Sequence, residues 1–354
     1  METCVPRPSA ALRGRWLAAG WLLLAAAALP AASAARARAG PLWYGLVPSA
    51  RAPHALSLVT LADDASIEST LGDVALGENE RAWPDGFRCL RGFCVFPTTT
   101  YKPPSPLPVF STVYNVSSAD ARVISRAPCG TGFCRDMQLD LASGDALVLS
   151  IEEQSTSVLR FAGARAAVRV ADVTAAVGNG DIDLGQTTHC SEAGAGGRFY
   201  IGVDYFGEAS DYIISVDVAG RKVANTTVLE KGVQVPDALW AKCDGSGLIG
   251  GVSFAPGRAG ANGTATFVTI DALGHATRGD AVGVPGDSVP TGMLTAASDS
   301  SHYLAAFYPQ ATPVNATDAR GWLWAVAPFG GSDDFVSRVN TYLVGAAYDA
   351  AQEI

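Results

Sequence analysis

The sequence predicts an all-β repeat fold, and three observations support this class. A glycine returns at intervals of 50 to 53 residues, and a serine follows 54 residues after the last, each time in a turn between two short apolar segments. The segments are rich in Val, Ile, Tyr, Phe and Thr and are interrupted by Gly and Pro, which is typical of β-strands. No amphipathic helical segment of useful length follows the N-terminal region. The recurring turn positions are Gly40, Gly92, Gly144, Gly197, Gly247 and Ser301.

Each repeat is expected to begin with a hairpin of two strands. In the third repeat, Asp136–Leu141 leads through the turn at 142–145 into Ala146–Ile151. Gly, Ser and Asp suit such turns because they tolerate positive φ or form local side-chain hydrogen bonds. The later repeats share this pattern, with predicted strands at Arg198–Val203, Trp240–Cys243, Leu248–Phe254, Met293–Ala296 and His302–Phe307.

A third and a fourth strand are expected after each hairpin. The third strands are predicted at Asp211–Asp217, Thr264–Ile270 and Gly321–Val326, and one fourth strand at Lys222–Leu229. Four strands in about 50 residues is the size of one propeller blade, and internal repeats of this period indicate propellers or related arrays.

Counting the turns from Gly40 predicts a six-bladed β-propeller of four-stranded blades. The first repeat begins at its turn, and Leu343–Asp349 resembles an innermost strand with no blade after it. We therefore expect the C-terminal strand to complete the first blade and close the ring, which removes open strand edges. A two-layer β-sandwich with coincidental glycine spacing is the alternative.

The blades resemble those of bacterial-type and extracellular β-propellers with YVTN- or NHL-like repeats. The resemblance lies in the pattern Asp/Ser-x-x-Gly followed by an apolar strand, and it covers the repeat region as a whole. The Tyr-Val-Thr-Asn signature itself is absent. The resemblance is generic: it implies the propeller fold and transfers no activity or site residue.

Residues 1–34 are predicted to form a cleaved secretory signal. Three arginines precede the apolar segment Trp16–Leu29, and Ala32-Ser33-Ala34 fits a cleavage site. The apolar segment is short for a membrane span, and a retained anchor helix is the alternative. No later segment is long and apolar enough to span a membrane. We expect residues 35–354 to form a single propeller domain that is secreted or lies in the secretory-pathway lumen.

The chain is acidic, with a formal net charge of −9. Removal of the signal takes away three arginines and one glutamate, so the balance becomes −11. A protein of this charge repels phosphate backbones, and nucleic acid is therefore not an expected partner. An extracellular glycan or protein is the expected class of partner.

Six cysteines remain after signal removal, and an even number in an oxidising compartment predicts disulfides. Spacing favours Cys89 with Cys94 across a hairpin turn and Cys129 with Cys134 at the same interval. Cys190 and Cys243 then remain, at corresponding positions of neighbouring repeats. A zinc site is the weaker alternative because His is scarce and zinc pairs are usually closer in sequence. Four sequons predict N-glycans at Asn115, Asn225, Asn262 and Asn315.

Carboxylates recur in the loops that lead from one repeat into the next. If these loops converge at the channel mouth, their side chains form an acidic ring that suits Ca²⁺, which takes six to eight oxygen ligands. The alternative is that Asp serves there as a turn residue. The segment 179–185 resembles the start of a calcium loop, although its glycine is one place late. The candidate calcium ligands are Asp85, Asp136, Asn179, Asp181, Asp183 and Asp237.

Two further hypotheses concern side chains in these entry loops. His189 is the best-placed candidate for a catalytic base. The Gly-x-Ser-x-Gly motif of serine hydrolases is absent, however, and a structural histidine is the simpler interpretation. Trp83 and Trp240 lie beside Asp85 and Asp237, a combination that can hold a sugar ring, or else they anchor blade packing.

The sequence thus favours a secreted, disulfide-stabilised and glycosylated propeller that acts as a binding module. The alternative is an enzyme, a calcium-assisted hydrolase or lactonase with His189 as base. Convergence of the carboxylates and His189 on one point would favour the enzyme.

Overall fold

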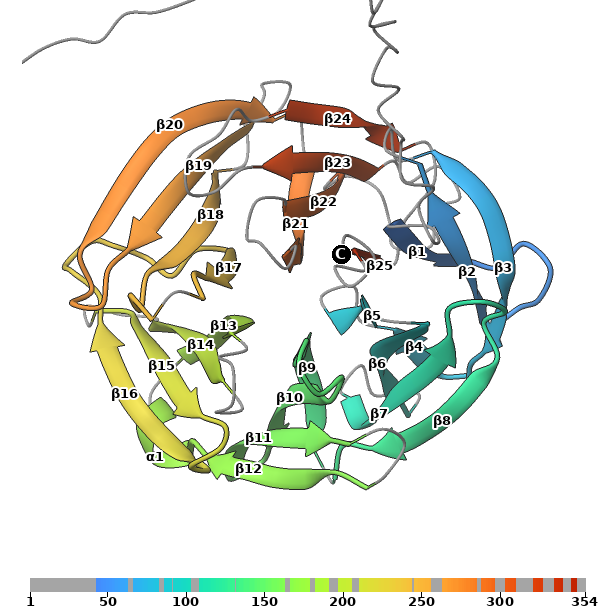
Figure 1. Ribbon diagram of the computed structural model, residues 1–354, viewed down its shortest axis with the longest axis horizontal. Helices are drawn as coiled ribbons and strands as arrows, with labels where there is room; N and C mark the ends of the chain where they lie inside the picture. Colours follow the sequence, from blue (N-terminus) through green and yellow to red (C-terminus); the bar gives the residue numbers. More distant parts are fainter. Residues whose placement is uncertain are drawn as a thin grey trace, which may run out of the picture. The chain divides into compact units, whose positions relative to one another are not determined.

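The computed structural model describes a ring of β-sheets (Figure 1). The described residues are 43–62, 66–82, 86–90, 92–102, 108–130, 132–162, 166–178, 182–190, 197–205, 210–243, 245–255, 263–284, 288–296, 303–309, 321–326, 334–339 and 345–348. The predicted signal, residues 1–34, lies outside them, as do Trp83, Asp85, Asn179, Asp181, Asn262 and Asn315.

The first three sheets are built from strands in the first half of the chain and one strand from its end. The first sheet contains β25 (Gly345–Tyr348), β1 (Trp43–Pro48), β2 (Ala55–Leu61) and β3 (Ile67–Ala75). The second contains β4 (Glu80–Ala82), β5 (Arg88–Leu90), β6 (Phe93–Tyr101), β7 (Pro108–Ser117) and β8 (Val123–Pro128). The third contains β9 (Phe133–Leu139), β10 (Ala146–Glu152), β11 (Ser155–Phe161) and β12 (Val168–Asp172).

The remaining sheets follow in chain order after the short helix α1 (Thr174–Val177). The fourth contains β13 (Ile182–Cys190), β14 (Arg198–Tyr205), β15 (Tyr212–Asp217) and β16 (Lys222–Val228). The fifth contains β17 (Ala238–Ala241), β18 (Ile249–Ala255), β19 (Gly263–Ile270) and β20 (Ala276–Val284). The sixth contains β21 (Ser288–Ala296), β22 (Tyr303–Pro309), β23 (Gly321–Val326) and β24 (Asp334–Val339).

Within each sheet the strands pair antiparallel from the centre of the ring outward, which is the arrangement of a β-propeller (Figure 1). The innermost strands β5, β9, β13, β17, β21 and β25 contact one another in that order, and β25 also contacts β5. In the first sheet β25 pairs with β1, with Tyr348 opposite Trp43. Strands from the two ends of the propeller unit therefore share one sheet.

The prediction of six four-stranded blades is wrong. In the described part of the chain five sheets have four strands each, and the second sheet has five. There the innermost strand is split, because β4 and β5 pair with opposite ends of β6. Pro84 lies between the two pieces and Pro97 lies in β6 opposite the gap. Proline has no N–H to donate, which weakens the hydrogen-bonded ladder of β6 at Pro97.

Hydrophobic cores lie between the faces of neighbouring sheets rather than in one central mass. Between the first and second sheets, Tyr44 and Leu58 pack with Phe87, Phe96 and Tyr114, and the rings of Phe96 and Tyr114 are stacked with centroids 5.3 Å apart. Similar clusters join the second to the third, the third to the fourth and the fourth to the fifth sheet. Among the residues that the structure describes, no helix has the length and apolar character needed to cross a membrane.

Bulges interrupt three of the innermost strands at corresponding places. The register shifts between β9 and β10, between β13 and β14, and between β21 and β22. A bulge bends its strand and changes the direction in which a side chain points. In β9 the bulge contains Asp136, and this carboxylate consequently reaches the neighbouring innermost strand.

All three predicted disulfides are confirmed. The Cα–Cα distances are 4.0 Å for Cys89–Cys94, 6.2 Å for Cys129–Cys134 and 5.3 Å for Cys190–Cys243. Cys89 and Cys94 are directly opposite each other in the β5–β6 hairpin. The third disulfide joins Cys190, the last residue of β13, to Cys243 in the turn after β17. It therefore connects the fourth and fifth sheets covalently.

Candidate functional site

A polar network connects the innermost strands of four neighbouring sheets. Asp136 in β9 accepts hydrogen bonds from the Thr187 N–H and Oγ1 in β13, both at 2.8 Å, and from its neighbour Met137 N–H at 2.6 Å. Arg88 in β5 lies 3.8 Å from the same carboxylate. Farther along the ring, the Ala241 N–H in β17 donates to Thr188 Oγ1 at 3.2 Å.

The Asp136 carboxylate is almost completely buried, with 2 % of its side chain exposed. Burial raises the pKa of this carboxyl above its ordinary value, while the Arg88 charge and the Thr187 hydrogen bonds act in the opposite direction. Both carboxylate oxygens are held by protein donors. A buried charge is stable only when other groups pair with it or donate hydrogen bonds to it. Because those groups lie on neighbouring innermost strands, the arrangement fixes one strand to the next.

The other candidate calcium ligands are distributed differently. Asp237 is exposed just before β17, and Asp183 lies in β13. Asp85, Asn179 and Asp181 lie outside the described residues. Within the ranges that the structure covers, no three His, Cys, Asp or Glu side chains come together in a way that could hold a metal ion. Convergence of the acidic ring on one point therefore stays a prediction.

Thermal unfolding in EDTA and in excess Ca²⁺ tests that prediction. A resident calcium ion binds only the folded state. At a free Ca²⁺ concentration 100 times the Kd, binding therefore stabilises the protein by about 2.7 kcal/mol. The calcium prediction therefore requires a clear rise in the unfolding temperature, with Mg²⁺ as the control because it prefers a smaller octahedral site. Superimposable curves in EDTA and Ca²⁺ would contradict it and remove the basis for a calcium-assisted hydrolase.

Two of the sequence candidates lie in packed surroundings. His189 is half-buried in β13 beside the Cys190–Cys243 disulfide, and a Cβ at Gly197 would fall 2.8 Å from its Nε2. Trp240 in β17 is 1 % exposed. Its indole lies flat on Gly250, where a Cβ would come within 1.9 Å of Nε1. The buried indole contributes to packing between β17 and β18, and Trp83 lies outside the described residues.

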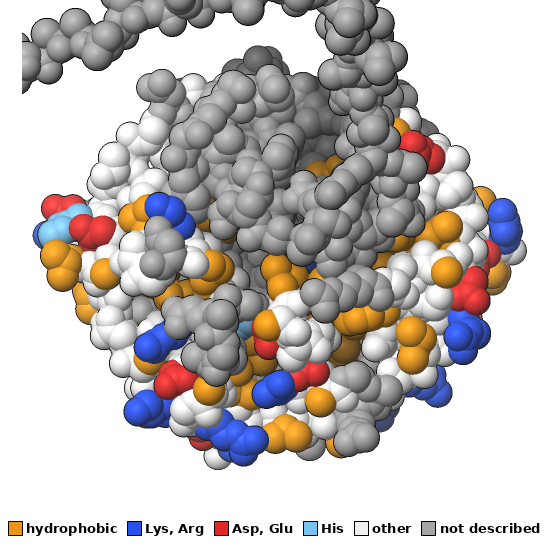
Figure 2. All heavy atoms as spheres, viewed as in Figure 1, with side chains coloured by type: hydrophobic (Ala, Val, Ile, Leu, Met, Phe, Trp, Pro, Cys, Tyr) orange, Lys and Arg blue, Asp and Glu red, His pale blue; other side chains and the backbone are white. Residues whose placement is uncertain are grey.

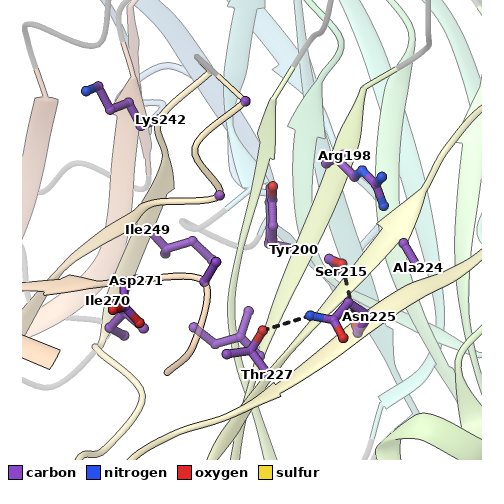
Figure 3. Close-up of a pocket in the computed structure, with 14 residues that line it drawn as sticks. Arg198, Tyr200, Ser215, Ala224, Asn225, Thr227, Lys242, Ile249, Ile270 and Asp271 are labelled. Atoms are coloured by element: carbon purple, nitrogen blue, oxygen red, sulfur yellow. Dashed lines mark hydrogen bonds between the residues drawn. The ribbon is translucent and has the colours of Figure 1, made fainter. Parts of the chain in front are cut away.

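A cleft of about 290 Å³ lies between the fourth and fifth sheets (Figure 3). We call it the inter-sheet cleft. One wall is formed by β14, β15 and β16, and the other by β18, β19 and the turns before β18 and after β19. The lining residues are Arg198, Tyr200, Ile213, Ser215, Ala224, Asn225, Thr227, Lys242, Gly245, Gly247, Ile249, Ile270, Asp271 and Ala272.

The cleft opens on the side of the ring that carries the tight turns. The turn residues Gly245 and Gly247 lead into β18, and Asp271 and Ala272 follow β19. Because successive antiparallel strands alternate in direction, the loops that enter each innermost strand lie on the opposite side of the ring. The cleft is therefore distinct from the channel mouth at which the sequence predicted a site.

Cationic groups dominate the charges in the cleft. Arg198 and Lys242 lie on opposite sides of it (Figure 3). The guanidinium of Arg198 makes no hydrogen bond or ion pair with any residue that the structure describes. The carboxylate of Asp271 accepts the N–H groups of Leu273 and His275 at 2.9 and 3.0 Å. The hydrogen bond from the His275 N–H is the main cause that lowers the pKa of Asp271. The negative charge of Asp271 is therefore stabilised by donors of its own turn.

The repeat pattern did not predict this cleft, which lies beside the turns within two repeats rather than in the loops between them. The sequence contains one signal for the cleft. The turn of one repeat has glycines at positions 245 and 247, and the second strand of the preceding repeat begins with a basic residue, Arg198. Small side chains leave space between blades, and a basic residue beside that space provides a charge. The pattern becomes meaningful only when the register between two sheets is known.

The two described sequons differ in their surroundings. Asn225 lies in β16 with an exposed side chain, and its Nδ2 donates to Thr227 Oγ1 at 3.2 Å. Asn115 lies in β7 between β6 and β8, and its buried Oδ1 has no hydrogen-bond partner among the residues that the structure describes. The exposed asparagine also forms part of the wall of the inter-sheet cleft.

Charged side chains on the ring are mixed rather than segregated. On the face shown in Figure 2, acidic and basic groups alternate around the periphery with hydrophobic groups between them. No single-sign patch of the kind that binds a nucleic-acid backbone is visible among the coloured side chains of this face.

Comparison with known proteins identifies the fold. Hydrazine synthase of Kuenenia stuttgartiensis is 14% identical, with 84% of each chain covered and a TM-score of 0.50. A chain of a nidogen/laminin complex is 10% identical, with 88% of this chain and 98% of that chain covered and a TM-score of 0.50. A putative 6-phosphogluconolactonase from Bacteroides uniformis is 11% identical, with 85% and 84% covered and a TM-score of 0.43.

No protein-family model matches the sequence, and no curated protein matches it either. At these low identities a structural likeness supports the fold and carries no activity or ligand across. The arrangement of the sheets identifies the chain as a β-propeller without a specific family, and the solved structures above share its fold at low identity.

Proposed function

We propose that this protein is a secreted, disulfide-stabilised binding module that holds its ligand in the inter-sheet cleft. The observation that carries the proposal is Arg198, which lines a cavity of about 290 Å³ and whose guanidinium has no partner among the described residues. Ligand sites are commonly concave, with an apolar lining and a few polar groups that fix orientation. Ile213, Ile249 and Ile270 provide the apolar part of this lining.

The three disulfides support an oxidising compartment, since such bonds persist outside the cytosol. The signal-like residues 1–34 are consistent with entry into the secretory pathway. We also propose that Asn225 carries an N-glycan, because its side chain is exposed on the outermost strand of its sheet. A shift in intact mass after enzymatic glycan removal that is smaller by one glycan in Asn225→Gln tests this assignment on the secreted protein.

Obstruction of the cleft tests the binding function. Ala224 lines the cleft and is exposed, so Ala224→Trp is expected to fill it and abolish binding to ligands found on a glycan and protein array. Thr226→Trp on the same strand is the matched control, since residue 226 is exposed and does not line the cleft. Because Asn225 lies in the wall, binding is measured before and after glycan removal.

The outcome separates the cleft from other surfaces. Loss of array binding in Ala224→Trp with retention in Thr226→Trp supports the proposal. Equal binding by wild type and Ala224→Trp would mean that the ligand contacts another part of the ring, and the cleft would no longer be the binding site.

A further inference from the structure

We infer that the inter-sheet cleft recognises a single acidic sugar residue, a hexuronic acid either free or at the end of an oligosaccharide. The inference deepens the proposed function and rests on it. Three features of the cleft carry it: a cation without an acidic partner among the described residues, a set of groups that suits sugar hydroxyls, and a size and overall charge that exclude long polyanions.

The cation is Arg198, at the first position of β14. Asp217 is its cross-strand partner in β15 and is the nearest acidic position in the sheet. The carboxylate of Asp217 instead accepts the Gly220 N–H at 2.8 Å within its own turn. Asp271, in the opposite wall, is likewise engaged by backbone donors of its turn. Lys242 adds a second positive charge across the cleft.

An arginine in this setting favours a carboxylate ligand. The planar guanidinium presents paired N–H donors that match the two oxygens of a carboxylate. Such charge-assisted hydrogen bonds are about twice as strong as neutral ones. An oxyanion on the ligand is therefore the group that this wall of the cleft recognises.

The remaining polar groups suit a hydroxylated ring. Tyr200, Ser215, Asn225 and Thr227 place hydroxyl and amide groups along the fourth-sheet wall (Figure 3). The amide of Asn225 uses one N–H in its bond to Thr227. Its Oδ1 can pair with a ligand hydroxyl, whether or not the nitrogen carries the proposed glycan. The isoleucines of the opposite wall provide an apolar surface for the C–H face of a sugar ring.

Size and net charge limit the ligand to one acidic residue. A cavity of about 290 Å³ is at the lower end of the range for small-molecule sites. The chain as a whole has a formal net charge of −9 and repels extended polyanions at long range. The negative net charge permits a short-range contact between the cleft and one carboxylate. It opposes the binding of a highly charged polymer along the protein surface.

The test is an NMR titration of the folded protein with methyl β-D-glucuronide and methyl β-D-glucoside, which differ only in the carboxylate. We expect the neutral glucoside to bind at least about tenfold more weakly, since a hydrogen bond to a charged group contributes about 1.5–3 kcal/mol. Arg198→Ala should weaken glucuronide binding by a similar factor, and Arg198→Lys by less, because lysine keeps the charge and loses the paired donors. Arg278→Ala, at an exposed position of β20, is the matched control.

Two disaccharides with glucuronate at the non-reducing or the reducing end distinguish a free acid from a chain terminus. Tighter binding of either one than of the monosaccharide assigns the terminus, and equal binding assigns the free acid. Inorganic sulfate that competes as well as the glucuronide would overturn the sugar assignment. Equal affinity for glucoside and glucuronide, unchanged in Arg198→Ala, would overturn the acidic assignment.

The failure of this inference can be told apart from failure of the proposed function. If neither glycoside binds but Ala224→Trp still abolishes binding of an array ligand, the cleft is a site for another ligand class and the hexuronic acid inference is wrong. If Ala224→Trp binds every ligand as the wild type does, the cleft is not the site. Circular dichroism of each variant confirms that loss of binding is not loss of fold.

Discussion

Replacement of Cys190 and Cys243 by alanine is expected to lower the free energy of unfolding by about 4 kcal/mol. The disulfide joins residues separated by 53 positions. In the chain-entropy model, cross-links that close loops of about 15 and about 100 residues contribute roughly 3 and 4.7 kcal/mol, and this loop lies between them. The bond also connects two sheets, so its removal frees the ends of two innermost strands. Guanidinium unfolding of the double variant measures the loss.

The matched control is Cys89→Ala with Cys94→Ala. These residues are only five positions apart, and they are already paired across a hairpin. The same entropy model assigns so short a loop roughly 2 kcal/mol. A loss in the Cys190/Cys243 variant no larger than in this control would show that the link between sheets adds nothing beyond hairpin closure.

Asp136→Ala is expected to cost about 3–5 kcal/mol of unfolding free energy, the range for breaking a buried ion pair by removing one partner. The variant removes the carboxylate that lies 3.8 Å from Arg88, whose side chain is only 7% exposed. It also removes the acceptor of the Thr187 N–H and hydroxyl. Chemical unfolding monitored by tryptophan fluorescence gives the value.

Two comparisons make the Asp136 result specific. Arg122→Ala removes a charge from an ion pair whose side chains are 72% and 57% exposed, and its unfolding curve should overlay that of the wild type. Asp136→Leu combined with Arg88→Met replaces the pair by apolar groups and should recover part of the loss. If the double variant is no more stable than Asp136→Ala, the cost comes from the lost Thr187 hydrogen bonds rather than from the lost pairing of Asp136 with Arg88.

The repeat pattern predicted most of the fold because turn chemistry and strand composition act locally. Gly92, Gly144, Gly197 and Gly247 all have positive φ, between 69° and 91°, as expected for the turns that the spacing located. The disulfides followed from the same register. The number of strands in the second sheet could not be predicted in this way. The split into β4 and β5 depends on how the innermost strand pairs with β6 on either side of Pro97.

The candidate sites were less predictable for a physical reason. Asp136 was predicted to face the channel as a metal ligand, but a bulge directs it to Thr187, and the sequence contains no local signal for that bulge. Trp240 was a candidate for holding a sugar ring or for anchoring blade packing, and Gly250 on the next strand provides the space that buries it in the packed position. The inter-sheet cleft depends on two sheets facing each other, which no single repeat encodes.

The pairing of β25 with β1 has a consequence for biosynthesis. About 300 residues separate Pro48, where β1 ends, from Gly345, where β25 begins. At ~5–20 residues per second, a ribosome needs on the order of 15–60 s to make that interval. During this time β1 is translated but lacks its neighbour, and an unpaired edge strand can associate with other chains. Vectorial synthesis therefore leaves the first sheet to be completed last, and the nascent chain depends on chaperones of its compartment until β25 emerges.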